Sequence, residues 1–400
     1  MDKANEEKID VQKIIYSLEN ILSKNRIKTI PLQEPQFLGK EWHYVKDCLD
    51  TGWVSSAGSY VERFESLLSE YTGAPYVVAT VNGTSALHMC LLLAKVQPDE
   101  EVLLPSLTFV ATANAISYCG AIPHFVDVDE ATLGIDANKL RSYLHEIATI
   151  ENNDQKSFCR NRQTGRIIKA IIPMHTFGHP VDMDPLVELS QQFGIKIIED
   201  AAESLGSFYK NRHTGTMSDL AAISFNGNKI ITTGGGGAIL TNNQELAILA
   251  KHLTTTAKTA HPWAYYHDSV GYNYRLPNIN AALGCAQIEN LPFLVKRKRE
   301  LAQKYEETFK NFRGLRFFTE PSFAQSNYWL NTLILNENGP KELEKLLSLT
   351  NKSGIMTRPV WTPLHQLPIY KKCPAMTLEV TESLAQRIIN IPSSANLIEA

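Results

Sequence analysis

The sequence predicts an α/β protein with a large domain built on a mostly parallel sheet and a smaller C-terminal α+β domain. Up to about residue 285, short apolar and β-branched runs alternate with stretches of helical spacing. After that point the pattern changes to a long charged helix followed by separate strands and helices. The chain has 400 residues, 44% of them hydrophobic, which suits one large domain and a smaller one.

We divide the chain into three parts: an N-terminal helix and arm (1–30), a large domain (31–284) and a small domain (285–400). Apolar residues at helical spacing predict the first helix over 8–24, and prolines then favour an extended arm. This helix is expected to pack on the main body or on a partner subunit, and the sequence leaves both options open.

Strands of the large domain are expected at 76–81, 101–104, 123–128, 166–172, 195–198, 220–225 and 238–240. Helices are expected at 86–95, 112–119 and 184–193. Strands that alternate with helices predict a parallel sheet covered on both faces, with ligands at the carboxyl ends of the strands. Residues 151–166 are polar and irregular, which predicts a long surface loop. The small domain is expected to contain a helix over 291–312 and strands over 327–335 and 355–361.

Composition excludes several classes of function. Lys plus Arg is 39 and Asp plus Glu is 42, so the net charge of -3 argues against nucleic acid or an anionic membrane as the main partner. Six scattered cysteines without a CxxC pair predict reduced thiols and no zinc site. No signal core and no apolar run near the ~18 residues of a membrane span is present, so we expect a cytoplasmic protein.

Three polar groups follow expected strands. The turn from Asn82 to Ser85, with Gly83 and Thr84 at its centre, precedes a helix and predicts either a phosphate site or an ordinary N-cap. Asp200 ends an apolar strand, where burial of its charge would require a cation or hydrogen-bond donors, unless it merely caps the next helix.

The third group is Lys229, which lies just before the glycine run 234–237. A partly desolvated lysine can act as a nucleophile, although most lysines are ordinary surface residues. A Schiff-base lysine, an acid for a ring nitrogen and a phosphate cup are the parts that a pyridoxal 5'-phosphate (PLP) site needs.

The motifs resemble the fold-type I PLP enzymes, specifically the sugar-nucleotide aminotransferases of the DegT/DnrJ/EryC1/StrS family, over about residues 30–398. The resemblance rests on the segments Asn82–Leu87, Pro105–Thr112, Phe177–Asp184, Glu199–Ser204, Ser224–Lys229 and Gly271–Arg275.

The resemblance implies a role for each matching residue. Lys229 would form the Schiff base with PLP, Asp200 would pair with the ring nitrogen, and Phe109 would stack on the ring. The phosphate would be held by Gly83, Thr84 and Ser224. Asn273 would reach the phosphate in the neighbouring subunit, which implies a homodimer with shared active sites. Glu203 stands where relatives often carry Gln or His near the ring oxygen, and its role is left open. No metal is implied.

A closer likeness is to the aminotransferases of the legionaminic-acid and bacillosamine pathways. It implies amination at C4 of a nucleotide-linked 4-keto-6-deoxy-N-acetylhexosamine, with UDP as the expected nucleotide and glutamate as the amino donor. Arg275, Arg358 and His365 are candidates for binding the sugar or diphosphate, and a structural salt bridge is an equal alternative for each. Two other readings remain: amination at C3 of another nucleotide sugar, or a non-enzymatic sensor that keeps the fold.

Overall fold

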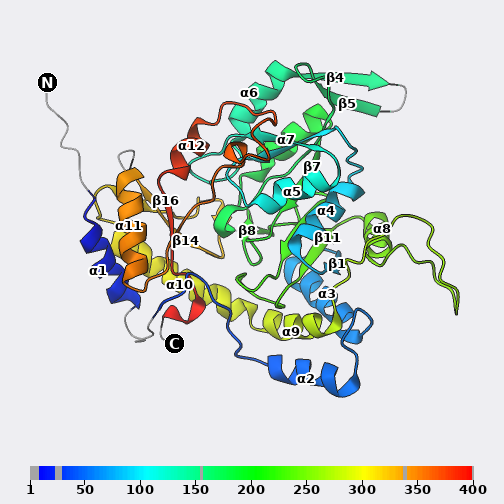
Figure 1. Cartoon of the computed structure of the whole chain (residues 1–400), viewed down its shortest axis with the longest axis horizontal. Helices are drawn as coiled ribbons and strands as arrows, with labels where there is room; N and C mark the ends of the chain where they lie inside the picture. Colours follow the sequence, from blue (N-terminus) through cyan, green and yellow to red (C-terminus); the bar gives the residue numbers. More distant parts are fainter. Residues whose placement is uncertain (1–8, 23–28, 154–155, 337–339, 399–400) are drawn as a thin grey trace.

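A seven-stranded sheet lies at the centre of the larger part of the molecule (Figure 1). The structure is a computed structural model that describes residues 9–22, 29–153, 156–336 and 340–398. In sheet order the strands are β1 (Tyr76–Thr80), β11 (Gly237–Thr241), β10 (Leu220–Ser224), β7 (Lys196–Asp200), β6 (Ile168–Ile171), β2 (Glu101–Pro105) and β3 (Ile122–Val126). All neighbouring pairs are parallel except those that β11 makes with β1 and β10. The expected mostly parallel sheet is therefore confirmed.

Helices cover both faces of this sheet because its strands are apolar on both sides. Ala222 packs on one face, with α4 (Gly83–Leu93), α5 (Val110–Tyr118) and α8 (Gln244–Thr254). Ala221, its neighbour in the strand, packs on the other, with α3 (Ser59–Thr72) and α9 (Asn278–Glu289). Further along that second face lie α6 (Ala137–Ile147) and α7 (Met183–Phe193). Helix α2 (Glu41–Thr51) lies outside α9 (Figure 1).

The smaller part contains a four-stranded antiparallel sheet. Its strands, in order, are β12 (Leu315–Phe317), β14 (Asn331–Leu335), β16 (Ile388–Ile391) and β15 (Arg358–Pro359). Apolar side chains of this sheet form one core with α10 (Leu291–Phe309), α11 (Pro340–Lys352) and α1 (Val11–Leu22). Figure 1 shows α1 beside α11 at one end of the molecule. The N-terminal helix thus packs on the small domain of its own chain, while residues 1–8 and 23–28 of the predicted N-terminal part lie outside the described residues.

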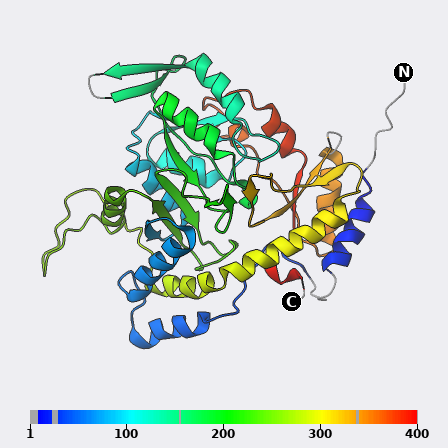
Figure 2. The ribbon, with the colours of Figure 1, turned by 180° about the vertical axis from the view of Figure 1, so that it is seen from behind.

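Helices α9 and α10 are separated by Asn290 alone and run one after the other along one side of the molecule (Figure 2). They connect the large sheet's helices to the small domain. The expected domain boundary at 284/285 falls inside α9, so the division into domains stays a prediction.

The predicted long loop over 151–166 is wrong. Strands β4 (Ala148–Asn153) and β5 (Lys156–Asn161) form an antiparallel hairpin there, in which Ile150 pairs with Cys159. The sequence shows no alternation of apolar and polar residues here, because a hairpin that projects from the body, as in Figure 1, needs few apolar side chains. The remaining small elements are β8 (Phe208–Tyr209), β9 (Arg212–His213), β13 (Ala324–Gln325) and α12 (Glu379–Ala385).

The predicted strand over 327–335 begins later than expected, at Asn331. Residues 327–330 instead form hydrogen bonds with the large domain, as the backbone N–H of Leu330 does with the carbonyl of Phe177 (3.3 Å). Among the described residues, no helix is long and apolar enough to cross a bilayer.

Candidate active site

The polar residues at the carboxyl ends of β1, β7 and β10 meet around one cavity of about 350 Å³. They lie at the same edge because β1 and β10 both run antiparallel to β11, and β7 runs parallel to β10. Its lining includes Asn82, Gly83, Thr84, Phe109, Thr112, Asp200, Glu203, Ser224, Lys229, Trp329 and Trp361. Two of these, Trp329 and Trp361, come from the small domain.

The N-terminus of α4 forms one wall of the cavity. Asn82 is the N-cap, and its Oδ1 accepts the N–H of Ser85 at 2.8 Å. The backbone N–H groups of Gly83 and Thr84 have no hydrogen-bond partner among the described residues. A Cβ on Gly83 would lie 2.8 Å from the Cβ of Ser224, so this glycine allows the Ser224 side chain to lie against the helix end. Free N–H groups at a helix N-terminus form an anion site.

The run of glycines allows close backbone approach at this wall. Gly237, the first residue of β11, lies so near the α4 turn that a Cβ there would be 2.5 Å from the carbonyl of Asn82. Any larger residue would push the turn outward. The local sequence therefore holds the helix N-terminus against the sheet edge.

Asp200 ends β7 with only 3% of its surface exposed. Its carboxylate accepts hydrogen bonds from the hydroxyl of Thr112 (2.7 Å) and the N–H of Ala202 (3.2 Å). Burial nevertheless raises the pKa of Asp200 above its ordinary value. A positively charged ligand atom at this carboxylate would relieve the desolvation cost.

Glu203 and Lys229 face each other across the cavity, with 3.5 Å between Oε1 and Nζ. The other carboxylate oxygen of Glu203 accepts the N–H of Phe177 at 2.9 Å. Burial raises the pKa of Glu203 to about 7, although the positive charge of Lys229 acts in the opposite direction. The side chain of Lys229 is 13% exposed, so it is not an ordinary surface lysine.

Comparison with known proteins decides which chemistry this site serves. Residues 36–400 match the model of the DegT/DnrJ/EryC1/StrS aminotransferase family. The chain belongs to this family. It is 36% identical to the GDP-perosamine synthase of Escherichia coli O157:H7 over 372 residues, 93% of this chain and 95% of that protein.

Two further relatives agree with this result. The putative pyridoxal phosphate-dependent aminotransferase EpsN of Bacillus subtilis is 36% identical over 379 residues, 93% of this chain and 92% of that protein. The PLP form of the putative sugar aminotransferase Spr1654 from Streptococcus pneumoniae superposes with a TM-score of 0.80 at 25% identity, covering 91% of this chain and 93% of that one. The protein is thus a PLP-dependent sugar-nucleotide aminotransferase with the fold-type I architecture, and the sensor reading finds no support.

The cavity fits PLP on four observations. The α4 turn offers unpaired N–H groups and a glycine cradle that a Cβ would fill, which suits a phosphate. Asp200 is a buried carboxylate that, among the described residues, forms no ion pair, although the charge of Lys229 acts on it; this suits a protonated ring nitrogen. Lys229 points into the same space. Phe109 caps α5 and is 51% exposed, which leaves its ring face open toward a flat ligand.

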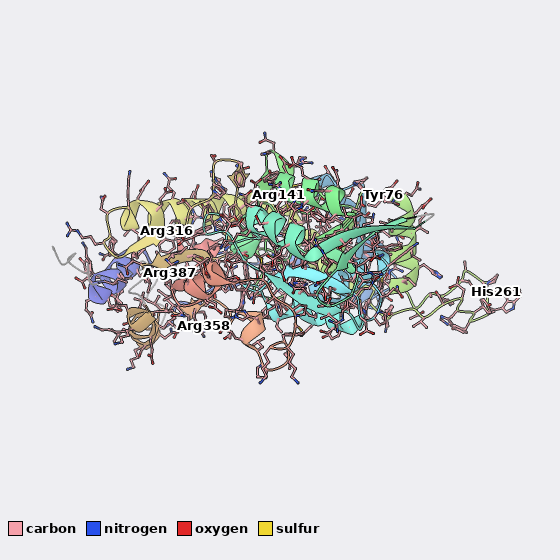
Figure 3. The ribbon with its side chains drawn as sticks, turned by 90° about the horizontal axis from the view of Figure 1, so that it is seen from above. Tyr76, Arg141, His261, Arg316, Arg358 and Arg387 are labelled. Atoms are coloured by element: carbon pink, nitrogen blue, oxygen red, sulfur yellow. The ribbon has the colours of Figure 1, made fainter. Side chains whose placement is uncertain are left out.

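Four predicted site residues do not line this cavity. Arg275 pairs its backbone with Thr80, and Asn273 is exposed and pairs with Thr255. Figure 3 labels Arg358, whose guanidinium donates to Asn351 Oδ1 (3.0 Å). Within one chain, Arg358 therefore lies outside the cavity lining, and its contact with the sugar stays a prediction.

His365 is likewise engaged within the protein. Its Nδ1 lies 2.8 Å from Ser106 Oγ, and its Nε2 lies 3.1 Å from a carboxylate oxygen of Glu382. Both ring nitrogens of His365 thus have partners within the protein, and a role in substrate binding stays a prediction.

Among the lining residues that sequence reasoning missed are Thr112, Trp329 and Trp361. Thr112 lies inside the segment Pro105–Thr112 that carried the family resemblance, so a residue-by-residue comparison could have found it. Trp329 had no signal, because its place in the cavity depends on how the small domain docks on the large one.

Proposed function

We propose that this enzyme transfers an amino group from glutamate to a nucleotide-linked 4-keto-6-deoxy-N-acetylhexosamine and so makes a 4-amino sugar for bacterial surface glycans. The observation that carries the proposal is Lys229, a lysine held in a cavity between buried carboxylates and beside an anion-binding helix end. Such a lysine is suited to proton transfer at a bound substrate.

The residues divide the work as follows. Gly83, Thr84 and Ser224 would hold the cofactor's phosphate, and Phe109 would pack on its ring. Asp200 would keep a proton on the ring nitrogen by its negative charge. PLP, when bound, carries the amino group between the two substrates and accepts electrons from the carbon that loses a proton. Lys229 Nζ, as a free amine, takes that proton from the carbon bearing the amino group and later returns a proton.

Two nucleotides, UDP and GDP, are candidates for the nucleotide part of the sugar substrate. The sequence resemblance to the legionaminic-acid and bacillosamine enzymes favours UDP. The relative from Escherichia coli is named for the GDP-linked sugar perosamine, which favours GDP. Amination assays with UDP- and GDP-linked keto sugars, each supplied as the 3-keto and the 4-keto form, decide both the nucleotide and the ring position.

A homodimer with shared active sites is part of the proposal. Residues 259–270 form an arm that leaves the body after α8, and Figure 3 shows His261 at its tip. Trp263, Tyr265 and Val270 on this arm are each more than 80% exposed. Exposed apolar patches of this kind mark interaction sites, and Asn273 lies at the base of the arm.

Borohydride reduction followed by peptide mass mapping tests the central residue. Reduction of the cofactor-loaded enzyme should leave a pyridoxyl group on Lys229, and Lys229→Ala should abolish turnover while pyridoxamine phosphate still binds. A label on another lysine, or near-normal transamination by Lys229→Ala, would remove Lys229 from the mechanism.

A further inference from the structure

The indole ring of Trp329 lies against the Lys229 side chain. Lys229 Nζ is 4.1 Å from the ring centroid, well within the ~6 Å at which an ammonium group is attracted to an aromatic face. Trp329 is 4% exposed, so little water competes for this contact. By comparison, the Glu203 oxygen is 3.5 Å from Nζ, which is long for a charged hydrogen bond.

Hydrogen bonds fix the position of this ring. Its Nε1–H donates to the carbonyl of Asn228, the residue just before Lys229, at 2.7 Å. The backbone N–H of Trp329 donates to Asn327 Oδ1 at 2.8 Å, and its carbonyl accepts from the buried Lys298 at 3.2 Å. The indole is therefore tied to the loop that carries the lysine as well as to its own segment.

The segment that carries Trp329 is held against the large domain at a cost in backbone strain. Tyr328, just before it, has a φ of 48°, in the left-handed region that side chains rarely adopt. Asn327 donates to the carbonyls of Glu203 (3.0 Å) and Leu205 (2.9 Å). A Cβ on Gly178 would lie 1.9 Å from Asn327 Oδ1, so a glycine there is what admits the segment. Strain that the surroundings maintain often indicates a functional constraint.

We propose that Trp329 is a positioning residue for Lys229. Whenever Lys229 is not joined to the cofactor, the Trp329 ring holds its ammonium group at the cavity wall beside Glu203. Among the described residues, the charged groups that act on Lys229 are the carboxylates of Asp200, at the end of β7, and of Glu203, in the turn that follows. Because Trp329 belongs to the small domain, docking of that domain then sets the place of the reacting lysine. The inference rests on the proposed role of Lys229 in transamination.

Competitive labelling of the cofactor-free protein tests the inference without any assay of turnover. Lys229 is acetylated with isotope-coded acetic anhydride, and its labelling rate is measured by mass spectrometry at about pH 7 and at about pH 11, where lysines are mostly charged and mostly neutral. The rate at about pH 7 is divided by the rate at about pH 11, and in this ratio any difference in how easily the reagent reaches Lys229 cancels. The variants are Trp329→Leu, which removes the ring, Trp329→Phe, which keeps an aromatic face, and Trp361→Leu, which opens the same cavity elsewhere.

Loss of the ring should free more neutral amine near neutral pH. Trp329→Leu should raise the ratio about three- to thirtyfold, while Trp329→Phe and Trp361→Leu should stay within about twofold of the parent protein. Trp329→Met, whose flexible side chain fills irregular space, repeats the test if the leucine variant does not fold. An unchanged ratio in both ring-free variants, or an equal rise in Trp361→Leu, overturns the inference. Borohydride trapping tests the role of Lys229 independently of the labelling experiment. Failure of the proposed function can therefore be told apart from failure of this inference.

Discussion

Asp200 and Glu203 are neighbouring buried acids whose carboxylates receive different hydrogen bonds. Asp200 receives hydrogen bonds from Thr112 and from a backbone N–H, whereas Glu203 receives one from Phe177 and faces Lys229. Donors stabilise a carboxylate, and burial alone destabilises it. We therefore assign Asp200 to a lasting negative charge in the loaded enzyme, and expect Glu203 to change its protonation near neutral pH.

Asp200→Asn tests the first assignment. The amide has nearly the same shape but no charge, so it cannot hold a proton on the ring nitrogen. Turnover should fall about a hundred- to a thousandfold, as for loss of one strong electrostatic contact in an active site. Far-ultraviolet circular dichroism should be unchanged, which separates loss of charge from loss of fold. A rate equal to that of the parent enzyme would contradict the role of Asp200.

Glu203→Gln tests the second assignment through stability. Burial raises the pKa of Glu203 from 4.5 to about 7, so the folded protein keeps a proton that the unfolded chain has lost. Between these pH values stability must fall as pH rises, by on the order of 3 kcal/mol for this group. The Gln variant lacks this fall. Urea unfolding of the cofactor-free protein at several pH values should show the two curves diverging over that window, and parallel curves would refute the raised pKa.

At the scale of elements, the α4 N-terminus acts as a unit because glycines let the sheet edge come close to it. Gly83→Ala should weaken PLP binding at least about tenfold, since its Cβ would meet Ser224 at 2.8 Å and displace a phosphate-binding group. Gly227→Ala is the matched control, because a Cβ there meets nothing within 4 Å. Equilibrium dialysis of the cofactor measures both variants, and equal affinities would argue against the cradle.

Element prediction succeeded where one local pattern decides the structure. In the run from Lys196 to Asp200, Ile197 and Ile198 are buried on opposite faces of the sheet, and every strand of the central sheet was predicted close to its true bounds. Prediction failed in two places for two different reasons: polar residues hid the alternation of a local hairpin, and distant contacts moved the start of one strand. The hairpin at 148–161 is held by its own cross-strand pairs, and residues 327–330 leave the expected strand because the large domain supplies their partners.

The same distinction applies to the site. Lys229 and Asp200 each follow a recognisable strand, so the sequence predicts that they share an edge. Trp329 reaches them from a part of the chain about a hundred residues away, through the strained turn at Tyr328. The spacing of apolar residues in the sequence cannot predict such a contact between distant parts of the chain. Arg358 shows the reverse case, since it was a candidate for binding the substrate but its guanidinium donates to Asn351 within the small domain.

At the scale of the whole molecule, the arm at 259–270 is the segment best placed to reach a partner subunit. It projects from the body beyond α8 in Figures 1 and 3, and it exposes Trp263 (82%) and Tyr265 (83%) to solvent. Most oligomers of one chain are twofold symmetric, so an arm that reaches a partner is matched by the partner's arm. Asn273, at the base of this arm, would then complete the neighbour's site rather than its own.

A mixing experiment decides whether the sites are shared. Lys229→Ala and Asn273→Ala are each expected to be inactive as homodimers. In a dimer formed from one chain of each, one site loses both residues and the other keeps both. Random reassembly of equal amounts makes about half of the dimers mixed, so activity should return to about a quarter of that of the parent enzyme. Lys229→Ala mixed with Asp200→Ala is the control, because these two residues line one cavity of one chain and no intact site can form. No recovery in the first mixture would place Asn273 in its own subunit's site or outside any. Recovery in the control would contradict the placing of Lys229 and Asp200 in the cavity of one chain.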